Sequence, residues 1–276
     1  MAEKWFGENW SDYVKNIDDS TIEEAKKSLL RYLPSEDWQN KVFVDIGCGS
    51  GIFSLAALKL GASLVISIDL DDKSINATNF VRSKYGKDYG DDSWEVRQGS
   101  ILDEALVNEI QGVGDIVYAW GSLHHTGNMK LAIKNACRIV KPNDGFLILA
   151  IYNHAISSER WLGIKKTFAG LPNLLKTPVE LAYASAVTLG YVAYRRTLNL
   201  KKDRGMDVFH DAIDWMRGYP YEYACVDEIE EFVEKEKFEI ISTPTELPCE
   251  RGKEANLLQV FRAKNVGCNE FVFGRD

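Results

Sequence analysis

Between Lys41 and Asn153, short apolar stretches rich in β-branched residues alternate with stretches of helical periodicity. The apolar stretches are KVFVDIG, SLVISIDL, WEVRQGS, DIVYAWGS and GFLILAIYN. Strands that alternate with helices pair in parallel, because each crossover helix returns the chain to the same end of the sheet. The sequence therefore predicts an α/β fold with a Rossmann-like, doubly wound sheet.

The segments on either side complete the expected fold. A helix is predicted from Ser20 to Leu33, with Thr21 and Glu24 spaced as a capping box and Pro34 marking its end. After Asn153 the alternation breaks, and it resumes with VDEIEEFVEKEKFEIIST and the terminal strand NEFVFGRD. We expect an N-terminal helical cap (1–40), a ligand-binding core (41–153), a mostly helical insertion after strand five that can form a lid (154–225), and a C-terminal part (226–276) that completes seven strands.

The glycine-rich stretch VDIGCGSG follows the first predicted strand. A dinucleotide fingerprint requires a third glycine where Ile52 stands, and a P-loop requires a lysine that this stretch lacks. Asp45 precedes the glycines, and Asp69 ends the second strand, where a carboxylate can accept hydrogen bonds from two ribose hydroxyls. The pattern favours a nucleoside that carries no phosphate.

Together, VDIGCGSG, Asp69, DIVYAWGSLHH and VKPNDGFLILAIYN resemble the class I S-adenosylmethionine-dependent methyltransferases of small-molecule type. The chain is also distantly similar to the methyltransferases of ubiquinone and menaquinone biosynthesis. The resemblance implies S-adenosyl-L-methionine as the cofactor. An NAD-dependent oxidoreductase and a non-catalytic S-adenosylmethionine-binding protein remain the alternatives.

The resemblance also implies which residues bind the cofactor. The glycine loop would lie under the methionine and ribose, Asp45 would orient the amino group, and Asp69 would bind the ribose. Leu70 would pack on the adenine. Many relatives carry an aspartate after strand three, where this chain has Ser100 and Ile101. The implied set is Asp45, Gly47, Cys48, Gly49, Gly51, Asp69, Leu70, Ser100, Ile101 and Trp120, of which Trp120 would contact the methionine.

Methyl transfer is an in-line displacement, and a base is needed only when the acceptor must lose a proton. His124 and His125 follow strand four, His154 follows strand five, and His210 lies in the insertion. We name His125, His154 and His210 as candidate bases, while a capping or packing role stays open for each. The tetrad of amino-methylating DNA enzymes is missing after strand four, and the Pro248-Cys249 pair lies in a late loop. A small-molecule acceptor is therefore expected, methylated on oxygen rather than nitrogen: a metabolite or a glycan or lipid precursor.

The acceptor pocket is expected to contain aromatic and basic residues of the insertion, namely Trp215, Tyr219, Tyr221, Arg195 and Arg196. The resemblance implies that Trp10, in the aromatic N-terminal stretch, covers the crevice, and a packing role for it stays open. Arg195 and Arg196 follow the apolar stretch LAYASAVTLGYVAY. Three roles stay open for them: binding an anionic group of the acceptor, lying on a membrane surface, or facing solvent.

Composition limits the partners and the compartment. A net charge of −8 disfavours nucleic acid, although residues 155–205 carry nine basic and three acidic residues. The five scattered cysteines form no CxxC pair, which argues against a disulfide framework and against a zinc site, so we expect no metal. The N-terminus lacks a signal-like apolar segment, and the apolar stretch Ala182–Ala193 is too short to span a bilayer. These features predict a cytoplasmic protein, and nothing in them predicts its oligomeric state.

Overall fold

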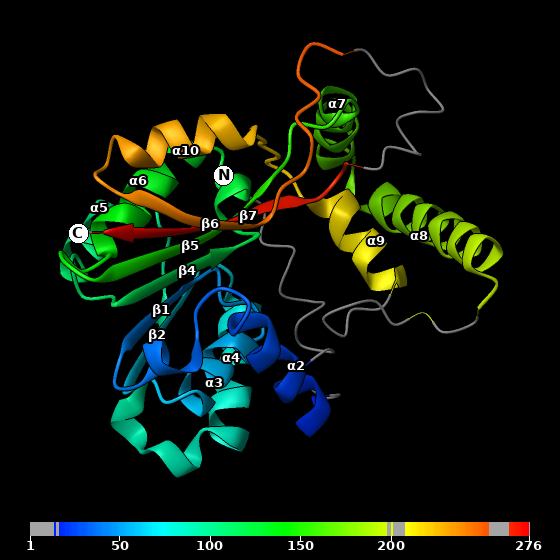
Figure 1. The fold of residues 1–276 in the computed structure, drawn as a ribbon. Coiled ribbons are helices and arrows are strands. Elements are labelled where there is room, and N and C mark those ends of the chain that lie inside the picture. Colours follow the sequence, from blue (N-terminus) through cyan, green and yellow to red (C-terminus); the bar gives the residue numbers. More distant parts are fainter. Residues whose placement is uncertain (1–13, 15–16, 198–199, 201–207, 254–264, 276) are drawn as a thin grey trace.

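A single seven-stranded sheet forms the centre of the described structure, with the strand order β3-β2-β1-β4-β5-β7-β6 (Figure 1). The computed structural model describes residues 14, 17–197, 200, 208–253 and 265–275. Neighbouring strands pair in parallel, except that β7 is antiparallel to both β5 and β6. The strands are β1 (Val42–Ile46), β2 (Leu64–Asp69), β3 (Trp94–Gln98), β4 (Ile116–Trp120), β5 (Gly145–Tyr152), β6 (Glu239–Thr245) and β7 (Cys268–Arg275).

Helices cover both faces of this sheet, three on each (Figure 1). One face is covered by α2 (Asp19–Leu29), α3 (Ile52–Lys59) and α4 (Asp72–Tyr85), the other by α5 (Glu104–Glu109), α6 (Met129–Ile139) and α10 (Val226–Glu234). Because side chains alternate along a strand, Phe43 and Val65 pack under the first group while Val44 and Ile66 pack under the second. Burial on both faces explains why the strands read as continuous apolar runs. The prediction of a doubly wound, seven-stranded sheet is confirmed.

The insertion after β5 consists of helices, as predicted. It contains α7 (Ser158–Ala169), α8 (Asn173–Arg195) and α9 (Val208–Arg217), which lie together beyond one end of the sheet (Figure 1). It has its own apolar cluster, centred on Trp161, Phe168, Met216 and Tyr221. Among the described helices, none is both long and apolar enough to cross a lipid bilayer.

The predicted capping box at Thr21 and Glu24 is wrong. The cap of α2 is Asp18, whose carboxylate accepts a hydrogen bond from the backbone N–H of Thr21 at 2.8 Å and another from its hydroxyl at 2.7 Å. Thr21 therefore lies inside the first turn, and α2 ends at Leu29, before the predicted Leu33. A capping box is present at α10 instead, between Cys225 and Glu228.

Candidate active site

The order of the strands reverses at β1, whose neighbours are β2 and β4, and a crevice forms at such a point in open α/β sheets. The loop after β1 and the segment after β4 touch there. Gly47 has φ 78°, and a Cβ on it would lie 2.3 Å from the Cβ of Ser122. The Ser122 hydroxyl donates to the carbonyl of Ile46 at 2.7 Å. The glycine loop is therefore in direct contact with the segment that leads to the two histidines.

Contacts with β2 and α4 hold the glycine loop in place. Gly47 and Cys48 donate their backbone N–H groups to the carbonyl of Ile68 at 2.7 and 3.1 Å. Gly51 caps α3 with φ 74°, and a Cβ there would lie 2.8 Å from Thr78 Cγ2. The buried Cys48 thiol lies 3.3 Å from the Thr78 hydroxyl, and burial raises its pKa well above the ordinary value. Thr78 thus sets how closely α4 packs against the loop.

Two carboxylates lie beside this loop, of which Asp45 is buried and Asp69 is partly buried. Asp45 accepts a hydrogen bond from the Ser54 hydroxyl at 2.6 Å, and burial raises its pKa to about 7. Asp69 accepts from the backbone N–H of Gly49 at 3.0 Å and of Asp71 at 2.9 Å, and burial raises its pKa to about 6. The charge of Asp69 also raises the pKa of Asp45. A cation bound between them would favour the ionised form of both.

The predicted adenine-side residues follow the adjacent strands β2 and β3. Leu70 follows Asp69 and is 42% exposed, which leaves an apolar side chain at the edge of the crevice. The Ser100 hydroxyl accepts from the backbone N–H of Leu102 at 3.1 Å, so it stabilises its own turn. Ile101 is buried in the core cluster under α6.

Trp120, the last residue of β4, is fixed by a buried carboxylate on β7. Its indole N–H donates to Glu270 Oε1 at 2.9 Å. Glu270 also accepts from Tyr32 at 2.8 Å, Arg31 at 2.9 Å and Thr245 at 2.7 Å. Burial by itself raises the pKa of Glu270, but the hydrogen bonds from Thr245, Trp120 and Tyr32 bring that pKa below its ordinary value. Glu270 therefore stays ionised and holds the Trp120 ring in one orientation.

His124 and His125 lie side by side, but their Nδ1 atoms face different backbone groups, an N–H in one case and a carbonyl in the other. Nδ1 of His124 accepts the backbone N–H of Tyr152 at 3.3 Å, so the neutral ring carries its proton on Nε2, which is buried without a hydrogen-bond partner among the described residues. Nδ1 of His125 lies 2.6 Å from the carbonyl of Pro220, which can only accept, so the lone pair is on Nε2. Burial lowers the pKa of both rings, that of His125 to about 3. At neutral pH, His124 is a donor and His125 an acceptor.

A buried lysine of α7 lies next to this pair. Lys165 is fully buried, donates to the carbonyl of Trp215, and places Nζ 3.9 Å from the Trp215 ring centroid and 4.7 Å from that of Tyr221. Burial lowers its pKa to about 7, whereas the two ring faces favour the protonated amine. A Cβ on Gly218 would lie 2.9 Å from His125 Cε1 and 3.2 Å from Lys165 Nζ, so one glycine separates the two groups.

Aromatic rings enclose these polar groups. The Tyr152 ring lies 3.9 Å from His124 and 5.4 Å from Trp215, measured between centroids. We call His124, His125, Tyr152, Lys165, Trp215 and Tyr221 the polar–aromatic cluster. It combines residues from the ends of β4 and β5 with residues of the insertion.

The remaining predicted site residues lie around or outside this cluster. His154 packs its ring 4.7 Å from that of Tyr223, and Tyr219 is partly buried. Arg195 and Arg196 are exposed at the end of α8. His210 is in α9, but its side chain lies outside the described part of the chain, as does all of Trp10.

Comparison with known proteins identifies the family. Residues 18–171, more than half of the chain, match the methyltransferase domain family. The chain belongs to this family. It is therefore an enzyme with S-adenosylmethionine as its cofactor, which decides against the dehydrogenase alternative.

Curated relatives of this methyltransferase match only a short stretch. Ribosomal protein L11 methyltransferase of Hamiltonella defensa is 55% identical over 49 residues, which are 18% of this chain and 16% of the relative. The enzyme of the same name from Colwellia psychrerythraea is 57% identical over 49 residues, 18% of this chain and 17% of the relative. Because so little of the relatives' length is covered, the likeness is local.

Solved structures support the fold over most of the methyltransferase. PKMT2 from Rickettsia typhi has a TM-score of 0.55 at 12% identity, covering 92% of this chain and 53% of that one. Magnesium protoporphyrin IX methyltransferase from Synechocystis PCC 6803 has a TM-score of 0.51 at 14% identity, covering 93% and 82%. The [4+2]-cyclase SpnF has a TM-score of 0.51 at 12% identity, covering 86% and 75%. A cyclase shares the fold, so the fold alone does not determine the reaction.

Sequence patterns did not single out three residues that organise the methyltransferase site: Lys165, Gly218 and Glu270. Lys165 is one of the nine basic residues in the segment 155–205. Only the fold shows that it is buried while its neighbour Lys166 is exposed. Glu270 could have been noticed as a carboxylate within the apolar strand NEFVF.

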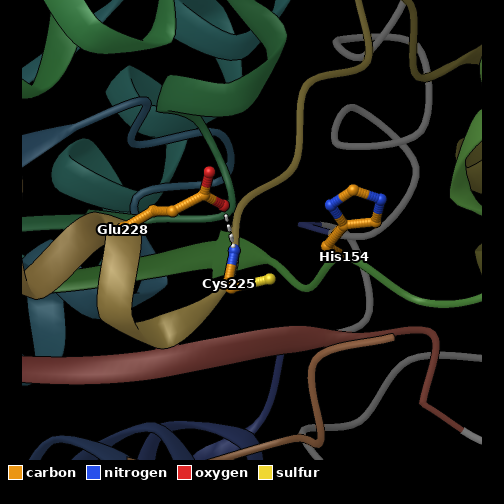
Figure 2. A group of neighbouring side chains, drawn as sticks. All are labelled: His154, Cys225 and Glu228. Carbon is orange, nitrogen blue, oxygen red and sulfur yellow. Dashed lines mark hydrogen bonds between the residues drawn. The ribbon is translucent and has the colours of Figure 1, made fainter. Parts of the chain in front are cut away.

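A second group of polar side chains lies nearby, at the start of α10. The potential ligand atoms of His154, Cys225 and Glu228 all lie within 4.8 Å of one another (Figure 2). However, Cys225 forms a disulfide with Cys249. The prediction from cysteine spacing that the chain lacks disulfides is therefore wrong for this pair. Spacing along the chain cannot show that a loop brings two distant cysteines together. Glu228 accepts the backbone N–H of Cys225 at 2.9 Å and pairs with Arg251 at 2.9 Å, so it already has a structural role.

Proposed function

We propose that this methyltransferase transfers a methyl group to a hydroxyl oxygen of a small metabolite or of a glycan or lipid precursor, with nitrogen acceptors less favoured. The observation that carries the proposal is the pair of neutral imidazoles on the segment after β4 that contacts the glycine loop. A hydroxyl must lose its proton as it attacks, so it needs a nearby base. The unprotonated Nε2 of His125 supplies that base.

The crevice suits the cofactor at several points. We assign the glycine loop with Cys48 to the methionine and ribose, Asp69 to the ribose hydroxyls, and Leu70 with Ser100 and Ile101 to the adenine. Asp45 and Asp69 together favour a cation, in agreement with an amino acid ammonium group. Trp120, oriented by Glu270, would pack on the methionine part.

The chain's own residues then have distinct roles. The bound cofactor supplies an electrophilic methyl group on a sulfonium. His125 Nε2 would take the proton from the acceptor hydroxyl as that oxygen receives the methyl group. His124 Nε2–H and the Lys165 amine orient the acceptor by hydrogen bonds, and Trp215 and Tyr221 keep water away from it. The products would be a methyl ether and S-adenosylhomocysteine, and His125 would pass the hydroxyl proton on to water because its pKa is low.

The test uses purified full-length protein and S-adenosylmethionine labelled in its methyl group. Phenols, sugars and carboxylic acids are offered as oxygen acceptors, primary amines as nitrogen acceptors, and ribosomal protein L11 as a protein acceptor. We expect label in an oxygen acceptor. Label found only in amines or only in the protein would overturn the proposal.

His125→Ala tests the assigned base. We expect the transfer rate to fall by about 100-fold, within the range for general-base removal, while the affinity for S-adenosylhomocysteine stays the same. Alanine variants of His154 and His210, the other two predicted bases, serve as comparisons. Wild-type rates in all three variants would show that no histidine acts as the base.

A further inference from the structure

The outer face of α8 is apolar although it is exposed. We define it by Leu174, Leu175, Val179, Leu181 and Leu189. Leu174 is 87% exposed and Leu189 is 69% exposed, and Tyr194, near the end of the helix, is 86% exposed. A helix at the surface of a water-soluble domain normally turns its polar residues outward, so this face is unusual for one that contacts water.

Two charged residues in the first half of α8 point the other way. Lys176 and Glu180 are buried, and Glu180 forms an ion pair with Arg217 of α9 at 2.7 Å. α9 lies between α8 and the sheet (Figure 1). Along most of its length the helix is therefore reversed: Lys176 and Glu180 face the protein and its leucines face outward, while Arg195 is exposed at its end. Such a face requires an apolar environment on its outer side.

Positive charge accumulates where this face ends. Arg195 and Arg196 are exposed and directly follow Tyr194. The surrounding segment, 155–205, carries nine basic and three acidic residues in a chain of net charge −8. Aromatic and basic side chains at the end of an apolar face are typical of helices at the boundary between lipid headgroups and acyl chains.

We propose that the outer face of α8 binds the surface of an anionic lipid bilayer. The helix lies in the plane of the membrane, with its leucines at the acyl boundary and Arg195 and Arg196 among the phosphates. Its 23 residues give it a length of about 34 Å along the surface. An anionic bilayer matches both the uncharged face and the basic end, whereas pairing two copies would bring two basic segments together.

The experiment measures co-sedimentation of the full chain with vesicles. Vesicles of phosphatidylcholine alone are compared with vesicles that also contain one quarter phosphatidylglycerol. We expect binding to the anionic vesicles that weakens in 0.5 M salt, because screening removes the contribution of the arginines. Leu174→Gln with Leu189→Gln should reduce binding at least tenfold, and Arg195→Gln with Arg196→Gln should reduce it only on anionic vesicles.

Phe80→Gln, at an apolar residue of α4 that is 42% exposed, is the matched control and should bind like the wild type. S-adenosylhomocysteine should stabilise every variant equally, which separates loss of the docking face from loss of the fold. If the wild type binds neither kind of vesicle, the proposal fails. A concentration-dependent dimer that the two leucine substitutions abolish, with no vesicle binding, would assign the face to a second copy and would also overturn it.

Discussion

At the scale of single residues, the function of each histidine depends on one backbone group. His124 and His125 are adjacent in the chain, but one ring faces a backbone N–H and the other a carbonyl. The N–H forces a lone pair onto Nδ1 of His124, and the carbonyl forces a proton onto Nδ1 of His125. The fold thereby turns two identical side chains into a donor and a base, a distinction that the printed sequence does not contain.

Gly218 provides a test of the spacing between His125 and Lys165. In Gly218→Ala the new methyl would lie 2.9 Å from the imidazole and 3.2 Å from the amine, so one of them must move. We expect the transfer rate to fall at least tenfold with unchanged affinity for S-adenosylhomocysteine. Gly163→Ala, on α7 with no atom within 4 Å of the added carbon, is the control. Equal rates in both variants would show that this spacing does not matter.

Lys165 predicts a dependence of stability on pH. Its pKa is about 7 in the folded chain and 10.5 in the unfolded chain, so between these values the unfolded state holds a proton that the native state lacks. Stability should therefore rise with pH across this window and level off below pH 7, where the native state is protonated as well. Between pH 7 and 9.5 the contribution is on the order of 3 kcal/mol.

Urea unfolding at pH 7 and pH 9.5 measures this contribution, with Lys165→Met as the comparison. The methionine variant removes the titrating group but keeps an unbranched side chain in the cluster. We expect a smaller pH-dependent gain in the variant than in the wild type. Identical gains would mean that Lys165 keeps its proton in the folded protein.

At the scale of elements, α8 and α9 depend on a buried ion pair. Arg217 contacts both carboxylate oxygens of Glu180 at 2.7 Å, and the two side chains are 16% and 5% exposed. Glu180 thereby fixes α9, which contains Trp215 and leads directly into Gly218 and Tyr221. The acceptor side of the site thus relies on a contact between two helices of the insertion.

Arg217→Met should loosen the insertion without unfolding the core. Leaving the Glu180 carboxylate buried without this partner costs about 3 kcal/mol. We expect faster proteolysis within residues 154–225, with S-adenosylhomocysteine still bound by the core. Arg138→Met removes a partly exposed pair with Glu104 and should cost less than about 1 kcal/mol. Proteolysis as slow as in the wild type would show that other contacts hold α9.

At the scale of the whole molecule, cofactor binding should stabilise the fold. A ligand that binds only the native state at 100 times its Kd adds about 2.7 kcal/mol to the free energy of unfolding. We expect S-adenosylhomocysteine to raise the melting temperature, NAD to leave it unchanged, and Asp69→Ala to abolish the increase. Asp88→Ala, at an exposed aspartate, is the control. A shift in Asp69→Ala as large as in the wild type would remove Asp69 from the proposed ribose site.

Much of the core could be predicted from local patterns. Every predicted strand is present. The central strands β1, β2, β4 and β5 were the clearest, because they are buried on both faces and read as apolar runs. The N-terminal helix shows the limit of such patterns. Thr21 and Glu24 have the spacing of a capping box, but the Asp18 carboxylate is within reach of the same backbone group and caps the helix.

The sequence by itself determined the α/β sheet, the glycine loop and the acids Asp45 and Asp69, because hydrophobic period and glycine conformation act over a few neighbouring residues. Only the tertiary structure decided which polar groups meet. It buries Lys165 beside His125, joins Cys225 to Cys249, and turns the leucines of α8 outward. Burial and contact depend on segments far apart in the chain, and their effect on pKa and packing arises only when the fold brings those segments together.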